Sequence, residues 1–302
     1  MNRKVIATIL ISTIACLSTA QSFSRINNYW DNLYSINPAS INDAYLGSAS
    51  MAVRKQWAGF PGAPTLMQGT ATVYFEDYYT QIGTKILAES KGLAHQLQFD
   101  ISYTYALLLR NQWVLNMALA LNFQNLSYDI TEITFPANTI PEVYDRLLVN
   151  NNLNAGIGFE LNYYNYKFGL ASQNLITAIK AKNDLHPNTN IFYAAFREQN
   201  SDYTNIGLGI SLFQQKNIFQ GEFNVNAYFK KTMESEKIQL GVIYRTWREA
   251  AFLFGVDLDR FKILYSFDYN FSPIYRHSYG SHEIMLIYNF NRTYRCINCG
   301  WY

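Results

Sequence analysis

Long segments of strictly alternating apolar and polar side chains limit most strongly how this chain can fold. From Leu148 to Leu161 the odd positions are mostly apolar, while the even positions include three asparagines and two glycines. The same alternation runs from Phe219 to Lys230 and from Phe261 to Asp268. A period of two is typical of β-strands with one apolar and one polar face. Segments of about ten residues are long enough to cross a membrane as tilted strands.

Beyond the first twenty residues, no apolar run reaches the roughly 18 residues that a membrane helix needs. If the chain spans a membrane, it must therefore do so as a closed barrel of strands. Fourteen strands are predicted, with starts near residues 47, 64, 78, 93, 112, 148, 163, 189, 203, 219, 236, 250, 260 and 281; the pattern near 189 is the least regular. An even number is usual for bacterial single-chain barrels. We expect an all-β fold, a transmembrane antiparallel β-barrel of about 14 strands in a bacterial outer membrane.

The connections between these segments also fit a barrel. Asn111-Gln112 and Asp259-Arg260 are predicted to be tight turns, while 129–147 and 172–187 are long and contain prolines. Short turns at one end and long loops at the other are typical of outer-membrane barrels.

The composition agrees with a lipid-facing surface. Charged residues make up 15% of the chain and aromatic residues 16%, whereas a soluble domain carries about 25% charged residues. Tyrosine and tryptophan gather near predicted strand ends, where amphipathic rings meet lipid headgroups. A soluble β-sandwich with an aromatic core is the less favoured alternative. The net charge of +2 gives no indication of nucleic-acid binding.

The amino terminus has the pattern of a secretory signal peptide. Arg3 and Lys4 precede the apolar stretch 5–17, and Ser18-Thr19-Ala20 forms a small-residue cleavage site. We predict a cleaved signal peptide over residues 1–20. A lipoprotein signal at Cys16 is less favoured, because Thr13 stands where an aliphatic residue is expected.

The predicted mature chain divides into an amino-terminal segment (21–45), the barrel (46–291) and a short tail (292–302). The first of these mixes Tyr29, Trp30 and Tyr34 with asparagines and has no long alternating strand. We interpret it as a candidate plug inside the barrel lumen. Lumenal arginines, Arg54 and Arg245 among them, are candidates to pair with acidic residues; for Lys55 and Arg248 a solvated position at the rim is favoured. The candidate acidic partners are Glu76, Glu222 and Asp268.

Several short blocks resemble one known family. They are Ile36-Asn37-Pro38-Ala39-Ser40, Arg54-Lys55-Gln56-Trp57, Gly59-Phe60-Pro61-Gly62-Ala63-Pro64, Tyr244-Arg245 with Glu249-Ala250-Ala251, Tyr265-Ser266-Phe267-Asp268-Tyr269, and Gly280-Ser281-His282-Glu283-Ile284. In this order they resemble the PorP/SprF outer-membrane proteins of Bacteroidetes, over most of the predicted mature chain. Residues 177–200 and those after 290 fit the family pattern less well.

The resemblance implies a barrel associated with the type IX secretion system, with outer-membrane lipids around it. Two roles are implied: a component of the machinery that contacts periplasmic ring lipoproteins, or a barrel that holds a large secreted adhesin, as in gliding bacteria. The residues it marks as possible partner contacts are Asn37, Pro38, Arg54, Trp57, Gly59, Phe60, Pro61, Gly62 and Pro64. Those it marks in the last strands are Tyr265, Asp268, His282 and Glu283.

The block 59–64 has two interpretations. Its two prolines lack backbone donors and its two glycines allow unusual dihedral angles, so a rigid turn between the first two strands is favoured. The sharper hypothesis is that Trp57, Phe60 and Pro61 form an apolar knob for a protein partner.

No pattern predicts an enzyme, a metal site or a cofactor. Cys296 and Cys299 form a lone C-x-x-C, for which a small disulfide is favoured over free thiols. His282-Glu283 does not begin an H-E-x-x-H motif, because position 286 is Leu286. The main alternative function is a porin or solute channel with an asparagine- and glycine-rich lumen. A structural outer-membrane protein without transport is a third.

Overall fold

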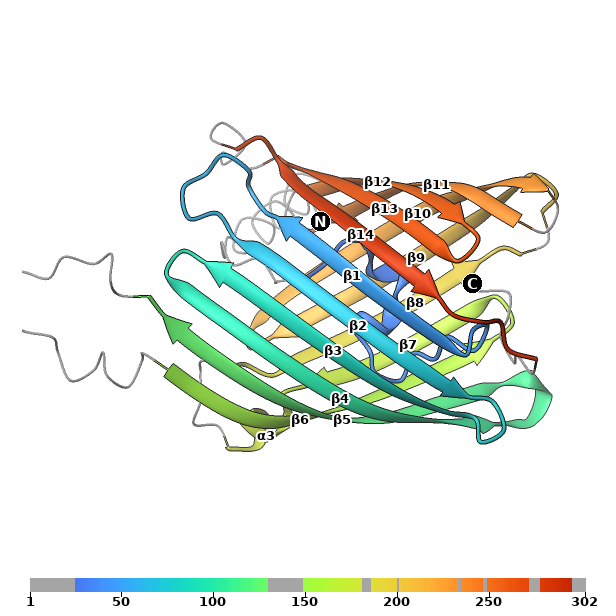
Figure 1. Ribbon diagram of the computed structural model, residues 1–302, viewed down its shortest axis with the longest axis horizontal. Coiled ribbons are helices and arrows are strands. Elements are labelled where there is room, and N and C mark those ends of the chain that lie inside the picture. Colours follow the sequence, from blue (N-terminus) through green and yellow to red (C-terminus); the bar gives the residue numbers. More distant parts are fainter. Residues whose placement is uncertain are drawn as a thin grey trace, which may run out of the picture.

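The computed structural model describes residues 25–129, 149–180, 186–199, 201–232, 235–246, 249–271 and 278–294. Fourteen antiparallel strands form one closed barrel, in which each strand pairs with the next in sequence and β14 closes on β1 (Figure 1). The predicted signal peptide and the two tail cysteines lie outside the described residues.

The strands differ in length from eight to fifteen residues. They are β1 (Gly47–Lys55), β2 (Thr65–Phe75), β3 (Thr80–Lys91), β4 (Ala94–Leu108), β5 (Val114–Tyr128), β6 (Val149–Tyr163), β7 (Tyr166–Gln173), β8 (Thr189–Arg197), β9 (Thr204–Gln215), β10 (Ile218–Thr232), β11 (Ser235–Arg245), β12 (Glu249–Leu258), β13 (Phe261–Asn270) and β14 (Ser281–Asn289).

The predicted fold class and strand number are confirmed. Every strand begins within three residues of its predicted start, the largest difference being at β7, which begins at Tyr166. The strand with the least regular pattern, β8, begins at Thr189 as predicted. Period-two alternation was therefore sufficient to locate all the strands of this barrel.

The two ends of the barrel differ in their connections. At one end, the turn end, the chain reverses tightly with left-handed residues such as Tyr164 (φ 46°) and Asp259 (φ 65°). The other, the loop end, carries the turn 56–64 and the β7–β8 connection, which contains the short helix α3 (Leu175–Lys180). The long β5–β6 connection lies outside the described residues. In bacterial barrels short turns face the periplasm and longer loops face the exterior, so the loop end is assigned to the cell surface.

The outer wall is apolar, as lipid contact requires. On β4 the outward side chains Leu97, Phe99, Ile101, Tyr103 and Tyr105 are between 40% and 53% exposed. The inward residues between them, including Gln98, Asp100 and Thr104, are buried and polar. This is the alternation of a membrane barrel, with its polar side towards the lumen. Within the described ranges, no helix is long and apolar enough to cross a membrane.

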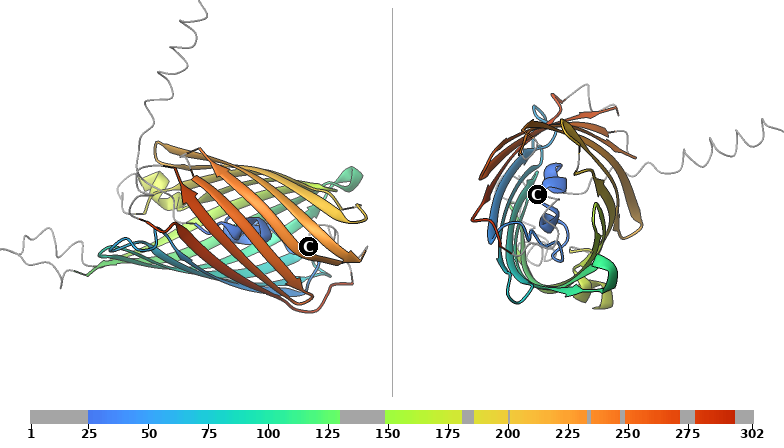
Figure 2. Two further views of the ribbon diagram at one scale, coloured as in Figure 1. Left: turned by 90° about the horizontal axis from the view of Figure 1, so that it is seen from above. Right: turned by 90° about the vertical axis from the view of Figure 1, so that its right-hand side faces the viewer.

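The space inside the barrel is occupied by residues 25–43, here named the internal segment. It includes two short 3₁₀ helices, η1 (Asn28–Asp31) and η2 (Leu33–Ser35). Figure 2 shows this segment, in blue, within the ring of strands. It begins beside the loop-end half of β1 and β14, crosses the lumen, and leaves at the turn end to enter β1.

Apolar side chains of the internal segment pack on apolar patches of the inner wall. Ile26 packs with Leu66, Leu264 and Met285, and Ile41 packs with Tyr74 and Val114. The largest of these clusters joins segment and wall residues: Tyr29, Leu33, Ile36, Ala171, Ile191, Tyr193 and Phe213. The hydrophobic core of this protein thus lies inside the barrel and is built around the internal segment.

Candidate functional site

Four of the family-like blocks, far apart in the sequence, meet in the loop-end half of the barrel. β1 brings Arg54, β11 brings Arg245, β13 brings Asp268 and β14 brings Glu283, all with side chains turned inward. The antiparallel register aligns three of these strands, because Arg54 pairs with Glu283 and Asp268 pairs with Ser281. Strand pairing therefore assembles a single cluster of charged side chains from separate blocks.

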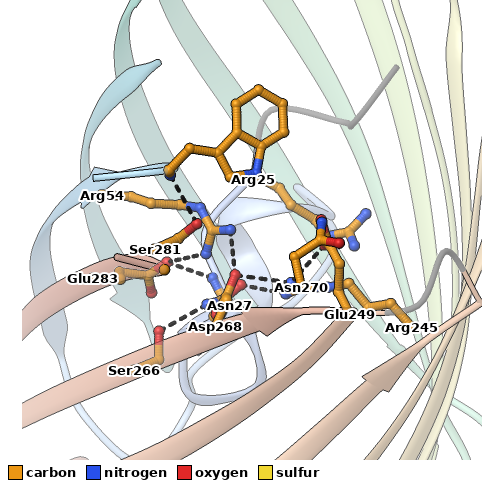
Figure 3. A network of polar contacts seen from close by, with 12 residues as sticks. Arg25, Asn27, Arg54, Arg245, Glu249, Ser266, Asp268, Asn270, Ser281 and Glu283 are labelled. Carbon is orange, nitrogen blue, oxygen red and sulfur yellow. Dashed lines mark hydrogen bonds and ion pairs between the residues drawn. The ribbon is translucent and has the colours of Figure 1, made fainter. Parts of the chain in front are cut away.

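The wall side of this cluster is a network of ion pairs (Figure 3). Arg54 contacts Asp268 at 2.5 Å and Glu283 at 3.5 Å. Arg245 contacts Asp268 at 3.1 Å, Glu249 at 3.4 Å, and also Glu222 of β10. Two arginines thus link carboxylates from four neighbouring strands.

The internal segment supplies the other side of the network. The backbone N–H groups of Asn27 and Asn28 donate to Glu283 at 2.7 and 3.0 Å, and the Asn28 side-chain amide donates to it at 2.7 Å. Arg25 pairs with Glu222, and the Tyr29 hydroxyl donates to Glu222 at 2.7 Å. The segment is therefore fixed to the wall through carboxylates that also bind wall arginines.

Because the charged groups of this network are buried, the loss of any one of them should strongly reduce the stability of the fold. Arg245 is 2% exposed and Glu283 is 1% exposed. Removal of one partner from a buried ion pair leaves an uncompensated charge and costs about 3–5 kcal/mol. The contacts of Arg25, Asn27 and Asn28 are for that reason strong local anchors of the internal segment.

A second anchor lies towards the turn end, around Asn37. Its side-chain amide donates to the Phe159 carbonyl at 3.0 Å and to the Tyr193 hydroxyl at 3.1 Å. The Tyr193 hydroxyl in turn donates to the buried carboxylate of Glu160 at 2.5 Å. The following residue, Pro38, accepts a hydrogen bond from Thr104 at 2.7 Å. The Asn37-Pro38 block thus ties the segment to β4, β6 and β8.

Asp31 forms a third anchor in the middle of the segment. Its carboxylate accepts hydrogen bonds from Lys262 at 2.5 Å and from Gln239 at 3.0 Å. The segment is therefore held by polar contacts at three points along its length.

Glycines of the inner wall leave room for particular side chains of the internal segment. A Cβ on Gly209 would lie 2.5 Å from the Trp30 ring, and a Cβ on Gly83 would overlap Tyr34. A Cβ on Gly158 would overlap Asn37 and lie 3.0 Å from the backbone nitrogen of Ala39. The fit of the internal segment against these positions is the physical reason why they are glycines.

Small cavities lie beside the internal segment. Two cavities of about 20 Å³ each lie between the segment and the described wall, one beside Asn32 and Thr70 and one beside Pro38 and Asn122. A water molecule needs about 10–15 Å³ of such space, so each cavity has room for one or two waters.

The block 59–64 forms the turn between β1 and β2. Trp57, Gly59 and Gly62 have positive φ angles of 51°, 89° and 68°. Gln56 donates to the Pro64 carbonyl at 2.9 Å, which closes the turn. Ala58 and the β13–β14 connection exchange two backbone hydrogen bonds, at 2.7 Å to Gly280 and at 2.8 Å from Tyr279. The turn is thus tied to β14, and Phe60 and Pro61 at its tip are exposed.

Beside this turn lies a cavity of about 220 Å³. It is lined by aromatic and small polar side chains. These are Trp57, Phe267, Asp268, Tyr269, Asn270, Ser278, Tyr279, Gly280 and Ser281.

The remaining predicted residues lie on other surfaces. Tyr265 and His282 face outward and share a hydrogen bond of 2.7 Å between the hydroxyl and Nδ1, while Glu283 faces inward. Lys55 also faces outward. Glu76 lies at the turn end, where it accepts the backbone N–H of Tyr294 at 2.9 Å, and is not part of the lumenal network. Arg248, Cys296 and Cys299 lie outside the described residues.

Sequence reasoning singled out the anchor at Asn37-Pro38 but missed the other two anchors of the internal segment. Arg25, Asn28 and Asp31 stood in no motif, although charged residues at inward positions of β10, β13 and β14 were a usable signal for buried partners. In the described part of the chain, no group of three metal-ligating side chains gathers.

A closed barrel with an apolar outer band and a charged, buried interior is an outer-membrane protein. The chain belongs to the PorP/SprF family: the family model described as type IX secretion system membrane protein PorP/SprF matches residues 18–288. No curated protein matches the chain in sequence.

Solved structures show the same fold. A deletion mutant of the monoaromatic hydrocarbon channel TodX has a TM-score of 0.53 at 9% identity, covering 90% of this chain and 96% of that chain. The toluene transporter TbuX of Ralstonia pickettii has a TM-score of 0.50 at 10% identity, covering 91% and 96%. At these identities the similarity concerns the fold alone.

Proposed function

We propose that this barrel supports the type IX secretion system through protein contacts at its two ends, either in secretion itself or in surface attachment of a large secreted adhesin, and that its lumen is closed. The observation that supports the closed lumen is the internal segment, which lies inside the barrel and is anchored there at three points.

The packing energy of the segment argues for permanent closure. Full burial of an apolar side chain contributes about 1.5–3 kcal/mol. Tyr29, Leu33, Ile36 and Ile41 are all buried against the wall, in addition to the ion-pair network. Withdrawal of the whole segment would lose these contributions together. We therefore propose that residues 25–43 act as a constitutive plug and that partners bind outside the lumen.

Exposed aromatic residues mark both ends as candidate contact surfaces. At the loop end Phe60 is exposed and Tyr279 is 81% exposed. At the turn end Tyr203 is 82% and Tyr294 is 94% exposed. Tyrosine is enriched at protein interfaces. The loop end is the candidate surface for a secreted adhesin and the turn end for a periplasmic component.

Site-specific photo-crosslinking tests these assignments. In native cells, a photoreactive residue at Tyr279 is expected to crosslink to a large secreted protein. The same residue at Tyr203 is expected to crosslink to periplasmic secretion components. The same residue at Tyr103, on the lipid-facing wall, is the matched control. Capture of no protein at either end, with the barrel correctly folded, would contradict the proposal.

A porin or solute channel is the alternative function. The internal segment lies across the described lumen and is anchored to the wall at Asn27, Asp31 and Asn37, which disfavours passage of solutes. Measured conductance distinguishes the two functions. The proposal assigns catalysis to no residue and requires no cofactor.

A further inference from the structure

One charged side chain stands out on the lipid-facing wall. In the loop-end half of the described strands, Lys55 is the only charged residue at an outward position. The registers of β2, β1, β14 and β13 place it in a row with Thr65 and His282, next to Phe267. Lys55, Thr65, Tyr265, Phe267 and His282 are here named the Lys55 patch.

The polar groups of the Lys55 patch are held in place. The Lys55 ammonium donates to the Ala63 carbonyl at 3.0 Å and to the Thr65 hydroxyl at 2.9 Å, which leaves one of its three hydrogens for another partner. The hydrogen bond between Tyr265 and His282 Nδ1 fixes the imidazole, so that Nε2 lies on the ring edge away from Tyr265. The patch therefore presents an oriented ammonium beside an oriented imidazole.

The barrel wall is short where this patch lies. β1 and β14 have nine residues each, whereas β4, β5 and β6 have fifteen. Ala49 pairs with Tyr288, whose ring lies 4.6 Å from that of Phe261 and marks an aromatic border. A strand rises about 3.4 Å per residue and is tilted by about 40° in a membrane barrel, so Lys55 lies about 16 Å above this border along the membrane normal. The apolar band of such a barrel is about 25 Å tall. The ammonium thus lies at or below the depth of the outer headgroups, where an unpaired charge is costly.

The cavity of about 220 Å³ lies beside the patch and shares Phe267 with it. Ser278, Ser281 and Asn270 supply hydroxyl and amide groups in its lining, and Trp57 and Tyr279 supply aromatic rings. The Asp268 carboxylate also lines the cavity, but it is already paired with Arg54 and Arg245. The hydroxyl and amide groups next to the aromatic rings suit a hydroxylated, partly apolar group better than a second charge.

We infer that the Lys55 patch and this cavity bind a phosphorylated glycolipid of the outer leaflet. Its phosphate accepts hydrogen bonds from Lys55 and His282, and its sugar enters the cavity. The phosphate supplies the negative charge that an ammonium at this depth requires. The lipid site shares Tyr279 with the loop-end contact surface proposed above, but lipid binding to the purified protein requires no protein partner and is tested independently of those contacts.

Native mass spectrometry of the delipidated, detergent-solubilised protein tests the inference, with monophosphoryl lipid A as the probe. The wild type is expected to bind one lipid. Lys55→Met is expected to bind it about tenfold more weakly, because the variant loses one charge-assisted hydrogen bond to the phosphate. Lys55→Arg is expected to restore most of the binding. Lys91→Met, which removes a loop-end lysine paired inward with Glu89 at 2.9 Å, is the matched control and should bind as the wild type.

Three results would overturn the inference. They are unchanged binding by Lys55→Met, equal binding of dephosphorylated lipid A, and displacement of the lipid by millimolar inorganic phosphate alone. Because Lys55→Met also removes two hydrogen bonds in the β1–β2 turn, folding is checked by the heat-dependent electrophoretic shift of the barrel. Thr65→Val, which loses one of those bonds but keeps the ammonium, should retain the phosphorylated lipid.

Discussion

Replacement of Glu283 by glutamine should detach the internal segment from the loop-end wall. Glu283 accepts three hydrogen bonds from Asn27 and Asn28, at 2.7, 3.0 and 2.7 Å, and pairs with Arg54 at 3.5 Å. Glutamine has nearly the same shape as glutamate but lacks its charge. Its amide nitrogen is a hydrogen-bond donor and would face the N–H donors of Asn27 and Asn28. Since the site is almost fully buried, we expect Glu283→Gln to lower the free energy of unfolding by about 3–5 kcal/mol.

Two assays measure this effect. Urea titration of the refolded protein in detergent gives the change in the free energy of unfolding. Maleimide labelling of a cysteine placed at Ser35, a buried position on the internal segment, reports whether that segment has loosened. In Glu283→Gln, labelling is expected to be faster than in the parent.

Glu249→Gln is the matched control. Glu249 belongs to the same network, with Arg245 at 3.4 Å and Asn270 at 2.8 Å, but none of its hydrogen bonds reaches the internal segment. It should lower stability without faster labelling at position 35. Stability within about 1 kcal/mol of the parent, together with unchanged labelling in Glu283→Gln, would refute the claim that this network anchors the segment.

Three further outcomes follow from the packing. Gly209→Ala, whose new Cβ would press on Trp30, should lower the free energy of unfolding by about 1–3 kcal/mol in urea titration. Gly69→Ala, whose new Cβ would lie at an ordinary 3.8 Å from the Ser50 carbonyl, should lower it by less than about 1 kcal/mol. Tyr193→Phe removes a donor from buried Glu160 and should cost about 1–3 kcal/mol, against no measurable loss for lipid-facing Tyr103→Phe. Burial lowers the pKa of His186. The local stability that its neutral form contributes should therefore be fully present above about pH 6.5 and should fall as the pH drops below that value. At pH 5, backbone hydrogen exchange near β8 should be faster in the parent protein than in His186→Gln.

Each of these outcomes has a result that would contradict it. Equal losses for Gly209→Ala and Gly69→Ala would mean that the Trp30 contact does not restrict the wall. Equal stability of Tyr193→Phe and the parent would mean that Glu160 has other sufficient donors. The same pH dependence in the parent and in His186→Gln would assign the exchange to other groups.

The outer wall was predictable from the sequence because every lipid-facing position favours an apolar side chain, which produces a regular alternation. A one-residue error in register would place a run such as Leu97, Phe99 and Ile101 in the lumen, so alternation alone locates the strands. The turn at 59–64 was predictable for a different reason, since Gly59 and Gly62 adopt positive φ angles that few other residues tolerate.

The contacts of the interior were not predictable from local pattern. Glu283 meets Asn27 across 256 positions of sequence, and Arg245 meets Asn27 across 218. Nothing near Asn27 in the sequence shows that its backbone N–H will meet a carboxylate. The 3₁₀ helices and α3 were also missed, because they are too short for a helical periodicity to appear.

Conductance of the unmodified protein in a planar lipid bilayer tests the central claim most directly. No stable open steps are expected, because residues 25–43 lie across the described lumen and are anchored to its wall. Glu283→Gln, measured in parallel, should at most add brief, irregular openings. Steady ohmic steps from the unmodified barrel would contradict a closed lumen and would favour a solute channel.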